Sequence, residues 1–232
     1  MGLMASSSGG GEYEQVPPGT HRAVCYKIVD GGTLMEGFQG EPERPRHCVF
    51  LFWELPEVRT GNDRPMSIFK QYTLSLNENS GLHKDLKSWR GKSFTPEELK
   101  GFDLKNVLGV SCDIEVEHNQ NGNAKVVSIF KPDGGAKKVA THNDQVAFDI
   151  DVYCAEFAGN SSPESKAHCD MFEELPRFIC TRIETSLEMQ AAIRKGDKAD
   201  KSATGLAGMA QEKEEKEEPE LPEEDFDDEI PF

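Results

Sequence analysis

The sequence predicts a mainly β fold followed by a helical extension and an acidic segment. Three observations support this class. Five stretches between residues 20 and 131 have strand character, a helical pattern separates the third from the fourth, and helical spacing returns after residue 170. The 232 residues, 36% of them hydrophobic and 29% charged, suffice for one domain of moderate size with an appendage, or for two small ones.

Alternation of apolar and polar residues locates the strands. The third segment alternates most cleanly, with Ile68 and Tyr72 on one face and Phe69 and Gln71 on the other. The second is almost continuously apolar (RHCVFLFWE), as in a strand that is buried on both faces or presents aromatics outward. An Asn-Gly pair in residues 119–122 predicts the turn of a final hairpin. The expected strands are residues 21–29, 46–54, 66–76, 110–117 and 124–131.

The insert between the third and fourth strands has helical spacing. Leu82, Leu86 and Trp89 recur at i, i+4 and i+7, and Gly91 is placed to end the helix. A second helical turn begins at Thr95, which is followed by proline and a capping-box glutamate. Three strands, a helical insert and two more strands is the order of an OB-fold, a five-stranded barrel that binds oligonucleotides. SH3-like barrels and sandwiches give similar strand signals without the insert.

The remaining chain is expected to be less regular. Residues 146–157 are consistent with one more strand, and residues 171–195 carry a helical stripe that includes Phe178 and Ile179. This extension either packs on the barrel or serves in oligomerisation or partner binding. We therefore expect a disordered arm (1–15), an OB-fold domain that binds single-stranded DNA (16–140), a strand and helix extension (141–195), and a flexible linker with an acidic docking tail (196–232).

The negative charge is concentrated in one segment. The net charge is −16, yet residues 212–232 alone hold twelve acids and two lysines, a net of −10. Residues 1–140 hold eighteen acids and seventeen Lys or Arg, a net of −1. A block of like charge repels itself and is expected to be disordered. We expect it to compete with DNA for the cationic groove, so that removing it raises DNA affinity.

The last eight residues form the most specific motif in the chain. They resemble the C-terminal tip of bacterial single-stranded DNA-binding proteins, with glutamate at 229 where that family usually has aspartate. The resemblance implies a docking peptide for replication and repair proteins such as a polymerase, helicase, primase or nuclease. The Phe232 ring can enter an apolar pocket of a partner while its α-carboxylate meets an Arg or Lys beside that pocket. The acids upstream can steer the segment to such a surface. The expected docking residues are Asp225, Phe226, Asp227, Asp228, Glu229, Ile230, Pro231 and Phe232.

A second resemblance covers about 130 residues of the body. Segments 72–76 (YTLSL), 86–91 (LKSWRG), 94–99 (FTPEEL) and 103–109 (DLKNVLG) are similar to bacteriophage proteins regarded as single-stranded DNA-binding or replication accessory proteins. This resemblance implies a role in DNA replication, recombination or repair in the cytoplasm of an infected bacterial host. The barrel segment does not align with the bacterial family, so the homotetramer of that family is not assigned to this chain. A homo-oligomer stays an open alternative.

Binding of single strands without sequence preference needs aromatic faces for bases and cations for phosphates. Strands 2 and 3 form the usual binding face of an OB-fold, and cations flank them. Each ring is also consistent with a place in the core. Lys137 and Lys138 extend the cationic set. The candidate DNA-binding residues are Arg44, Arg46, Phe50, Phe52, Arg59, Arg64, Phe69, Lys70, Tyr72, Trp89, Arg90 and Lys92.

Catalysis and metal binding receive little support. The chain has no Walker A, GxGxxG, GxSxG or HExxH motif, so we expect neither an enzyme nor a cofactor. Asp113, Glu115 and Glu117 alternate as on the wet face of a strand, although paired carboxylates can hold Mg²⁺ in a nuclease. The six cysteines are scattered and fit reduced cytosolic thiols; a metal set around His168 and Cys169 is the alternative.

The chain has no stretch that approaches the roughly 18 to 20 apolar residues needed for a helix to cross a bilayer, so we expect no membrane association. An alternative from another functional class is an acidic interaction protein, or decoy, that sequesters host replication enzymes without binding DNA.

Overall fold

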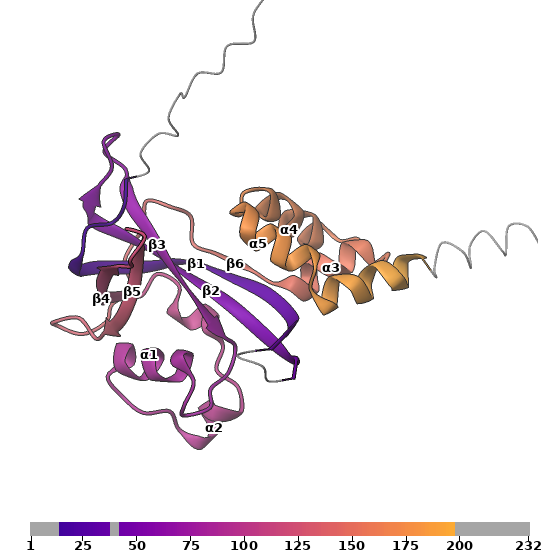
Figure 1. The fold of residues 1–232 in the computed structure, drawn as a ribbon, viewed down its shortest axis with the longest axis horizontal. Coiled ribbons are helices and arrows are strands. Elements are labelled where there is room, and N and C mark those ends of the chain that lie inside the picture. The colour runs from indigo at the N-terminus through magenta and orange to yellow at the C-terminus, as the bar shows by residue number, and fades with distance from the viewer. Residues whose placement is uncertain (1–13, 38–41, 198–232) are drawn as a thin grey trace, which may run out of the picture.

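A six-stranded sheet, mainly antiparallel, forms the centre of the molecule (Figure 1). The computed structural model describes residues 14–37 and 42–197. The hydrogen-bonded order is β3-β2-β1-β4-β5, and β6 pairs in parallel with β1. The strands are β1 (Gly19–Glu36), β2 (Arg44–Arg59), β3 (Pro65–Thr73), β4 (Ser111–His118), β5 (Ala124–Phe130) and β6 (Val146–Phe148).

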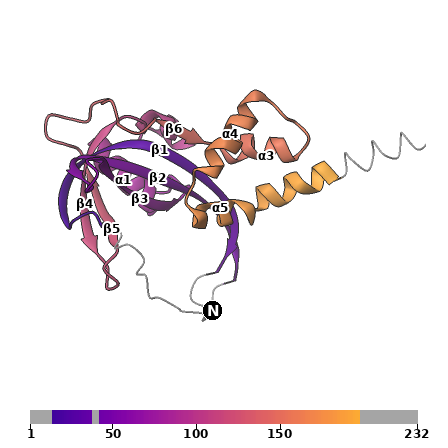
Figure 2. The same ribbon diagram turned by 90° about the horizontal axis from the view of Figure 1, so that it is seen from above.

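Helices occupy two separate places around the sheet (Figures 1 and 2). One group lies between β3 and β4 in the chain, and the other follows β6. None of the helices in the described part of the chain is long and apolar enough to cross a membrane. The helices are α1 (Gly81–Arg90), α2 (Pro96–Lys100), the 3₁₀ turn η1 (Leu104–Val107), α3 (Ile150–Phe157), α4 (Pro163–Glu173), α5 (Arg177–Glu184) and residues 187–197.

Local signals set the ends of the inserted helices as expected. The Ser80 side chain accepts a hydrogen bond from the His83 N–H at the start of α1, and Gly91 ends the helix with a left-handed φ of 65°. Thr95 and Glu98 form the expected capping box at α2. The antiparallel sheet with its helical insert therefore agrees with the sequence prediction.

β1 and β2 form a longer ribbon than the sequence predicted. β1 does not end before its glycine pair but continues through it, with register shifts between Cys25 and Lys27 and between Asp30 and Thr33. A Cβ at Gly32, where φ is +70°, would lie 2.5 Å from the Cδ1 atom of Ile150. The register shift between Asp30 and Thr33 therefore lies where Ile150 of α3 packs against the backbone of the ribbon.

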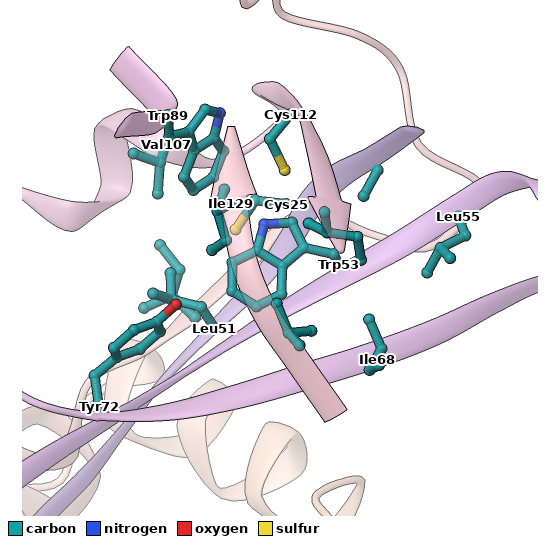
Figure 3. Packing of buried hydrophobic residues seen from close by; sticks show 14 of the residues in the cluster. Cys25, Leu51, Trp53, Leu55, Ile68, Tyr72, Trp89, Val107, Cys112 and Ile129 are labelled. Carbon is teal, nitrogen blue, oxygen red and sulfur yellow. The ribbon is translucent and has the colours of Figure 1, made fainter. Parts of the chain in front are cut away.

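The first core fills the concave side of the sheet, beneath α1. Trp53 of β2 and Trp89 of α1 lie 6.1 Å apart between ring centroids, and Figure 3 shows them with Tyr72 of β3. The Trp89 Nε1–H donates to the Ser111 carbonyl over 2.8 Å. The alternation predicted for β3 is confirmed, since Ile68 and Tyr72 are buried here while Phe69 is exposed.

Hydrogen bonding between strands does not close this sheet into a barrel, because β3 and β5 are not paired neighbours. A side chain bridges them instead. The Lys70 Nζ donates to the Val127 carbonyl of β5 over 3.2 Å and to Asp85 Oδ2 of α1 over 2.8 Å. Tyr72 O–H also donates to Asp85 Oδ2 over 2.8 Å. We name Lys70, Tyr72 and Asp85 the seam cluster, because they join the two open edges to α1.

The second core lies on the opposite face of the β1–β2 ribbon, beneath the helices that follow β6. Residues 146–157 do not form the single strand that the sequence suggested. A three-residue strand ends at Phe148, and Asp149 then caps α3 by accepting hydrogen bonds from backbone N–H groups. The core combines strand side chains with helix side chains, so segments 16–140 and 141–195 share it. Its fully buried members include Val29, Phe50, Ile150, Ile179 and Ile183.

A histidine between two carboxylates ties residues 187–197 to the ribbon. His47 Nε2 lies 2.6 Å from Asp30 Oδ1, and His47 Nδ1 lies 3.5 Å from Glu188 Oε1. Glu188 also accepts hydrogen bonds from the Thr33 N–H (2.8 Å) and hydroxyl (2.5 Å). The hydrogen bond with Asp30, together with nearby acids that include Asp151, raises the pKa of His47 above its ordinary value.

We expect this histidine to make stability depend on pH. The pKa of His47 is higher in the folded protein than in the unfolded chain, where it is about 6.5, so the protonated side chain stabilises the fold. This stabilisation is complete when the pH is below the unfolded-state pKa, and it is lost as the pH rises through the folded-state pKa. The difference in unfolding free energy between wild type and His47→Gln should therefore be larger at pH 6 than at pH 9. Urea denaturation at both pH values measures it. An equal difference at both values would contradict a charged His47.

Candidate nucleic-acid interface

Four of the five predicted rings are buried. Phe50 and Phe52 are 1% and 6% exposed because the second core covers them, and Phe50 lies edge-on to Phe178 of α5 at 5.9 Å. Tyr72 and Trp89 belong to the first core and are 4% and 2% exposed. In this arrangement none of these four rings offers a face on which a base can stack. The sequence left open whether the β2 rings lie in the core or on an open face, and the helices after β6 cover that face.

Phe69 is the predicted ring that reaches the surface. It is 40% exposed on β3, and its ring stacks with that of Phe178 at 5.3 Å between centroids and 28° between planes. Phe178 is 50% exposed. We name these two residues the ring pair. Sequence periodicity placed Phe178 on the apolar stripe of its helix, and only the fold brings it onto β3.

Arginines gather where α5 meets the end of the ribbon. Arg182 Nη1 lies 2.7 Å from Glu36 Oε1, and Glu36 faces Arg44 in the β1–β2 register. Arg182 also lies beside Cys48, where burial raises the pKa of that thiol to about 11 and keeps it neutral. Arg177, next to Phe178, is highly exposed, with 82% of its side chain open and Glu184 at 3.8 Å. Arg46, opposite Leu34 in the same register, lies two residues from Arg44 on β2. The sequence analysis singled out Arg44 and Arg46 and missed the two arginines on α5.

Several predicted cations have structural contacts instead. Lys70 belongs to the seam cluster. The Arg90 guanidinium pairs with Glu98 and lies over the ring of Phe102, with its carbon 5.0 Å from the centroid, and it also lies 4.5 Å from the Phe94 ring. Arg59 donates to the Asp63 carbonyl over 3.1 Å in the turn between β2 and β3, where Arg64 is exposed. These residues hold turns and helices in place.

A separate group of lysines lines the exposed side of α1. Lys84, Lys87 and Lys92 border a shallow depression of about 400 Å³. Lys131, at the end of β5, packs its side chain over Gly91, where an added Cβ would lie 2.6 Å from Lys131 Cδ. We name Lys84, Lys87, Lys92 and Lys131 the lysine surface. Only Lys92 was a predicted contact, because the proximity of Lys131 to α1 depends on the fold.

The loop after β5 adds two more lysines near the same end of α1. The Ser111 N–H donates to the Lys137 carbonyl over 2.8 Å, and the Lys137 N–H donates to Ser111 Oγ over 3.0 Å. Ser111 also accepts the hydrogen bond from Trp89 of α1. Lys137 and Lys138 are exposed. They extend the lysine surface along this loop.

The acidic and sulfur-containing candidates do not assemble into a metal site. Asp113 pairs with Arg22 at 2.5 Å between Oδ1 and Nε, and Glu117 is exposed at the end of β4. Across residues 14–37 and 42–197, no three His, Cys, Asp or Glu side chains are grouped to hold a metal ion. All six cysteines are free thiols. The predicted docking residues 225–232 lie outside the described residues.

No protein-family model matches the chain, and a search of the curated proteins finds no similar sequence.

Proposed function

We propose that this protein binds single-stranded DNA without sequence preference, on a sheet that corresponds to an OB-type barrel. The strand order β3-β2-β1-β4-β5 and the helical insert between β3 and β4 support the assignment. In a closed barrel β3 and β5 would meet, and Lys70 already spans these two edges. The proposed setting is phage DNA replication, recombination or repair, with the protein coating exposed strands.

The exposure of Phe69 is the observation that carries the proposal. Its side chain is 40% exposed on the outer face of β3, the strand that usually contacts bases in an OB-fold, beside the ring of Phe178. A single base can stack on such a ring, because every nucleobase presents a π face. On the same strand face, Gln71 and Thr73 are exposed and offer hydrogen-bonding groups.

Phosphate binding falls to exposed cations. The lysine surface offers four ammonium groups from two elements, and Lys137 and Lys138 add two. Charges of this kind attract the backbone without reading sequence. Residues 225–232 would then recruit replication and repair proteins to the coated strand, as the resemblance of that segment implies. The protein acts here as a binding protein, not as an enzyme.

A titration with fluorescently labelled oligo(dT), followed by anisotropy at several salt concentrations, tests the proposal. We expect binding that weakens steeply as salt increases, because phosphate contacts release counterions. Phe69→Ala should lower the affinity about tenfold through the loss of one stacking contact. Phe157→Ala is the matched control, since Phe157 is an exposed phenylalanine, 39% open, at the end of α3.

Absence of binding even in dilute buffer would refute the proposal. A second candidate would then apply, an acidic interaction protein that engages replication enzymes through residues 225–232 without touching DNA. The burial of Phe50, Phe52, Tyr72 and Trp89 favours this candidate, because it removes four of the expected stacking faces. The two functions make opposite predictions for the oligo(dT) titration.

A further inference from the structure

The ring pair is formed by two elements that are far apart in the sequence. Phe69 comes from β3 and Phe178 from α5, and their near-parallel stack is within the usual range for aromatic pairs. Phe178 also touches Phe50 edge-on at 5.9 Å, and Phe50 in turn lies 6.2 Å from Phe69. The buried ring therefore supports both exposed rings from below.

Phe178 is not needed to anchor its helix. The second core holds α5 through Ile179 and Ile183, both 0% exposed, and through Cys180. The pair between Arg182 and Glu36 attaches the helix to the ribbon as well. Phe178 remains half exposed, although Ile179 and Cys180, which follow it on α5, are buried. With Phe69 it forms a patch of two adjacent exposed rings, and such a patch is more informative than a single exposed apolar side chain.

A cation precedes this ring in the chain. Arg177 precedes Phe178, and 82% of its side chain is exposed. Its contact with Glu184, at 3.8 Å in an exposed position, is weak. A nucleotide that stacks on Phe178 therefore has a guanidinium available for its phosphate. Two exposed rings with an exposed guanidinium one residue away in the chain match the chemistry that binds an unpaired strand.

We propose that α5 forms half of the single-strand site, with Phe178 as a second base-stacking ring and Arg177 as a phosphate contact. This inference rests on the proposed function, but it assigns the site to the helical extension as well as to the sheet. Bases would continue the stack that Phe69 and Phe178 begin. The extension would then be part of the binding surface, and not a separate oligomerisation element.

Substitutions on the full-length chain separate this inference from the proposed function. Phe178→Ala should lower oligo(dT) affinity about tenfold with an unchanged salt slope, because a ring carries no charge. Arg177→Gln should reduce the salt slope by about 0.7, the value for one phosphate contact on a single strand. Phe157→Ala should bind as wild type does. Thermal unfolding of each variant shows whether it is folded.

A spectroscopic variant gives a direct readout. In Phe178→Trp, tryptophan emission should be quenched when oligo(dT) saturates the protein, because a base stacks on the indole; Phe157→Trp should keep its emission. Wild-type binding combined with unchanged affinity in folded Phe178→Ala would overturn the inference and leave the proposed function standing. Tighter binding by Phe178→Ala would also overturn it, since Phe178 would then be covering Phe69. If wild type fails to bind, the proposed function itself falls.

Discussion

Replacing all four residues of the lysine surface by glutamine is expected to weaken binding to oligo(dT) about 100-fold at 0.1 M salt. Each phosphate contact contributes roughly 0.7 to the slope of log K against log salt for a single strand, so the slope should fall by about 3. The substitution keeps the side-chain stems, including that of Lys131 over Gly91. Anisotropy titrations at several salt concentrations give both quantities.

The control for this variant must remove the same number of positive charges from other parts of the surface. Four lysines that are exposed but lie outside the lysine surface serve this purpose: Lys100, Lys125, Lys166 and Lys195. Their replacement by glutamine should alter the slope little, because long-range effects of surface charge are screened. If both quadruple variants weaken binding equally, net charge and not the lysine surface governs the interaction.

Removal of the Asp85 carboxylate is expected to destabilise the fold by about 3 kcal/mol. Asp85 Oδ2 accepts hydrogen bonds from both Lys70 and Tyr72, and its side chain is 18% exposed. Burial, and then the Asp85 charge, raises the pKa of Tyr72 far above its ordinary value, so this hydroxyl remains a donor at all ordinary pH values. In Asp85→Ala both donors lose their acceptor inside the seam cluster.

Urea denaturation of Asp85→Ala measures this loss. Tyr72→Phe is the matched comparison, because it removes one of the two hydrogen bonds and keeps the ion pair with Lys70; we expect about 1 kcal/mol. The loss of the carboxylate should also reduce DNA affinity, since it removes the ion pair and the hydrogen bond that link β3 to α1. Equal stability of Asp85→Ala and wild type would show that the seam cluster is not important for the fold.

Local features of this fold could be predicted from the sequence because their causes lie within a few residues. Ser80 and Gly91 bound α1 through hydrogen bonds and a left-handed φ that the neighbouring residues determine. The two faces of β3 follow in the same way from alternation. The continuation of β1 through Gly31 and Gly32 could not be predicted in this way, because residues distant in the sequence, such as Ile150, pack against these glycines.

The candidate site was harder to predict, because alternation tells which residues share a face but not what covers that face. Phe50 and Phe69 both point to the outer side of their strands, and α5 buries the first while leaving the second partly open. Phe178 and Lys131 enter the site through contacts between residues that are forty or more positions apart in the sequence. Such contacts leave no mark in a short window of the chain.

The shared second core has a practical consequence for anyone who wants the sheet alone. A fragment that stops at residue 140 would keep Tyr26, Phe50 and Phe52 but lose Ile179 and Ile183, which shield them. The apolar surface exposed in this way would make the fragment prone to aggregate and precipitate. Expression trials should therefore retain the chain through residue 197, where its described helices end.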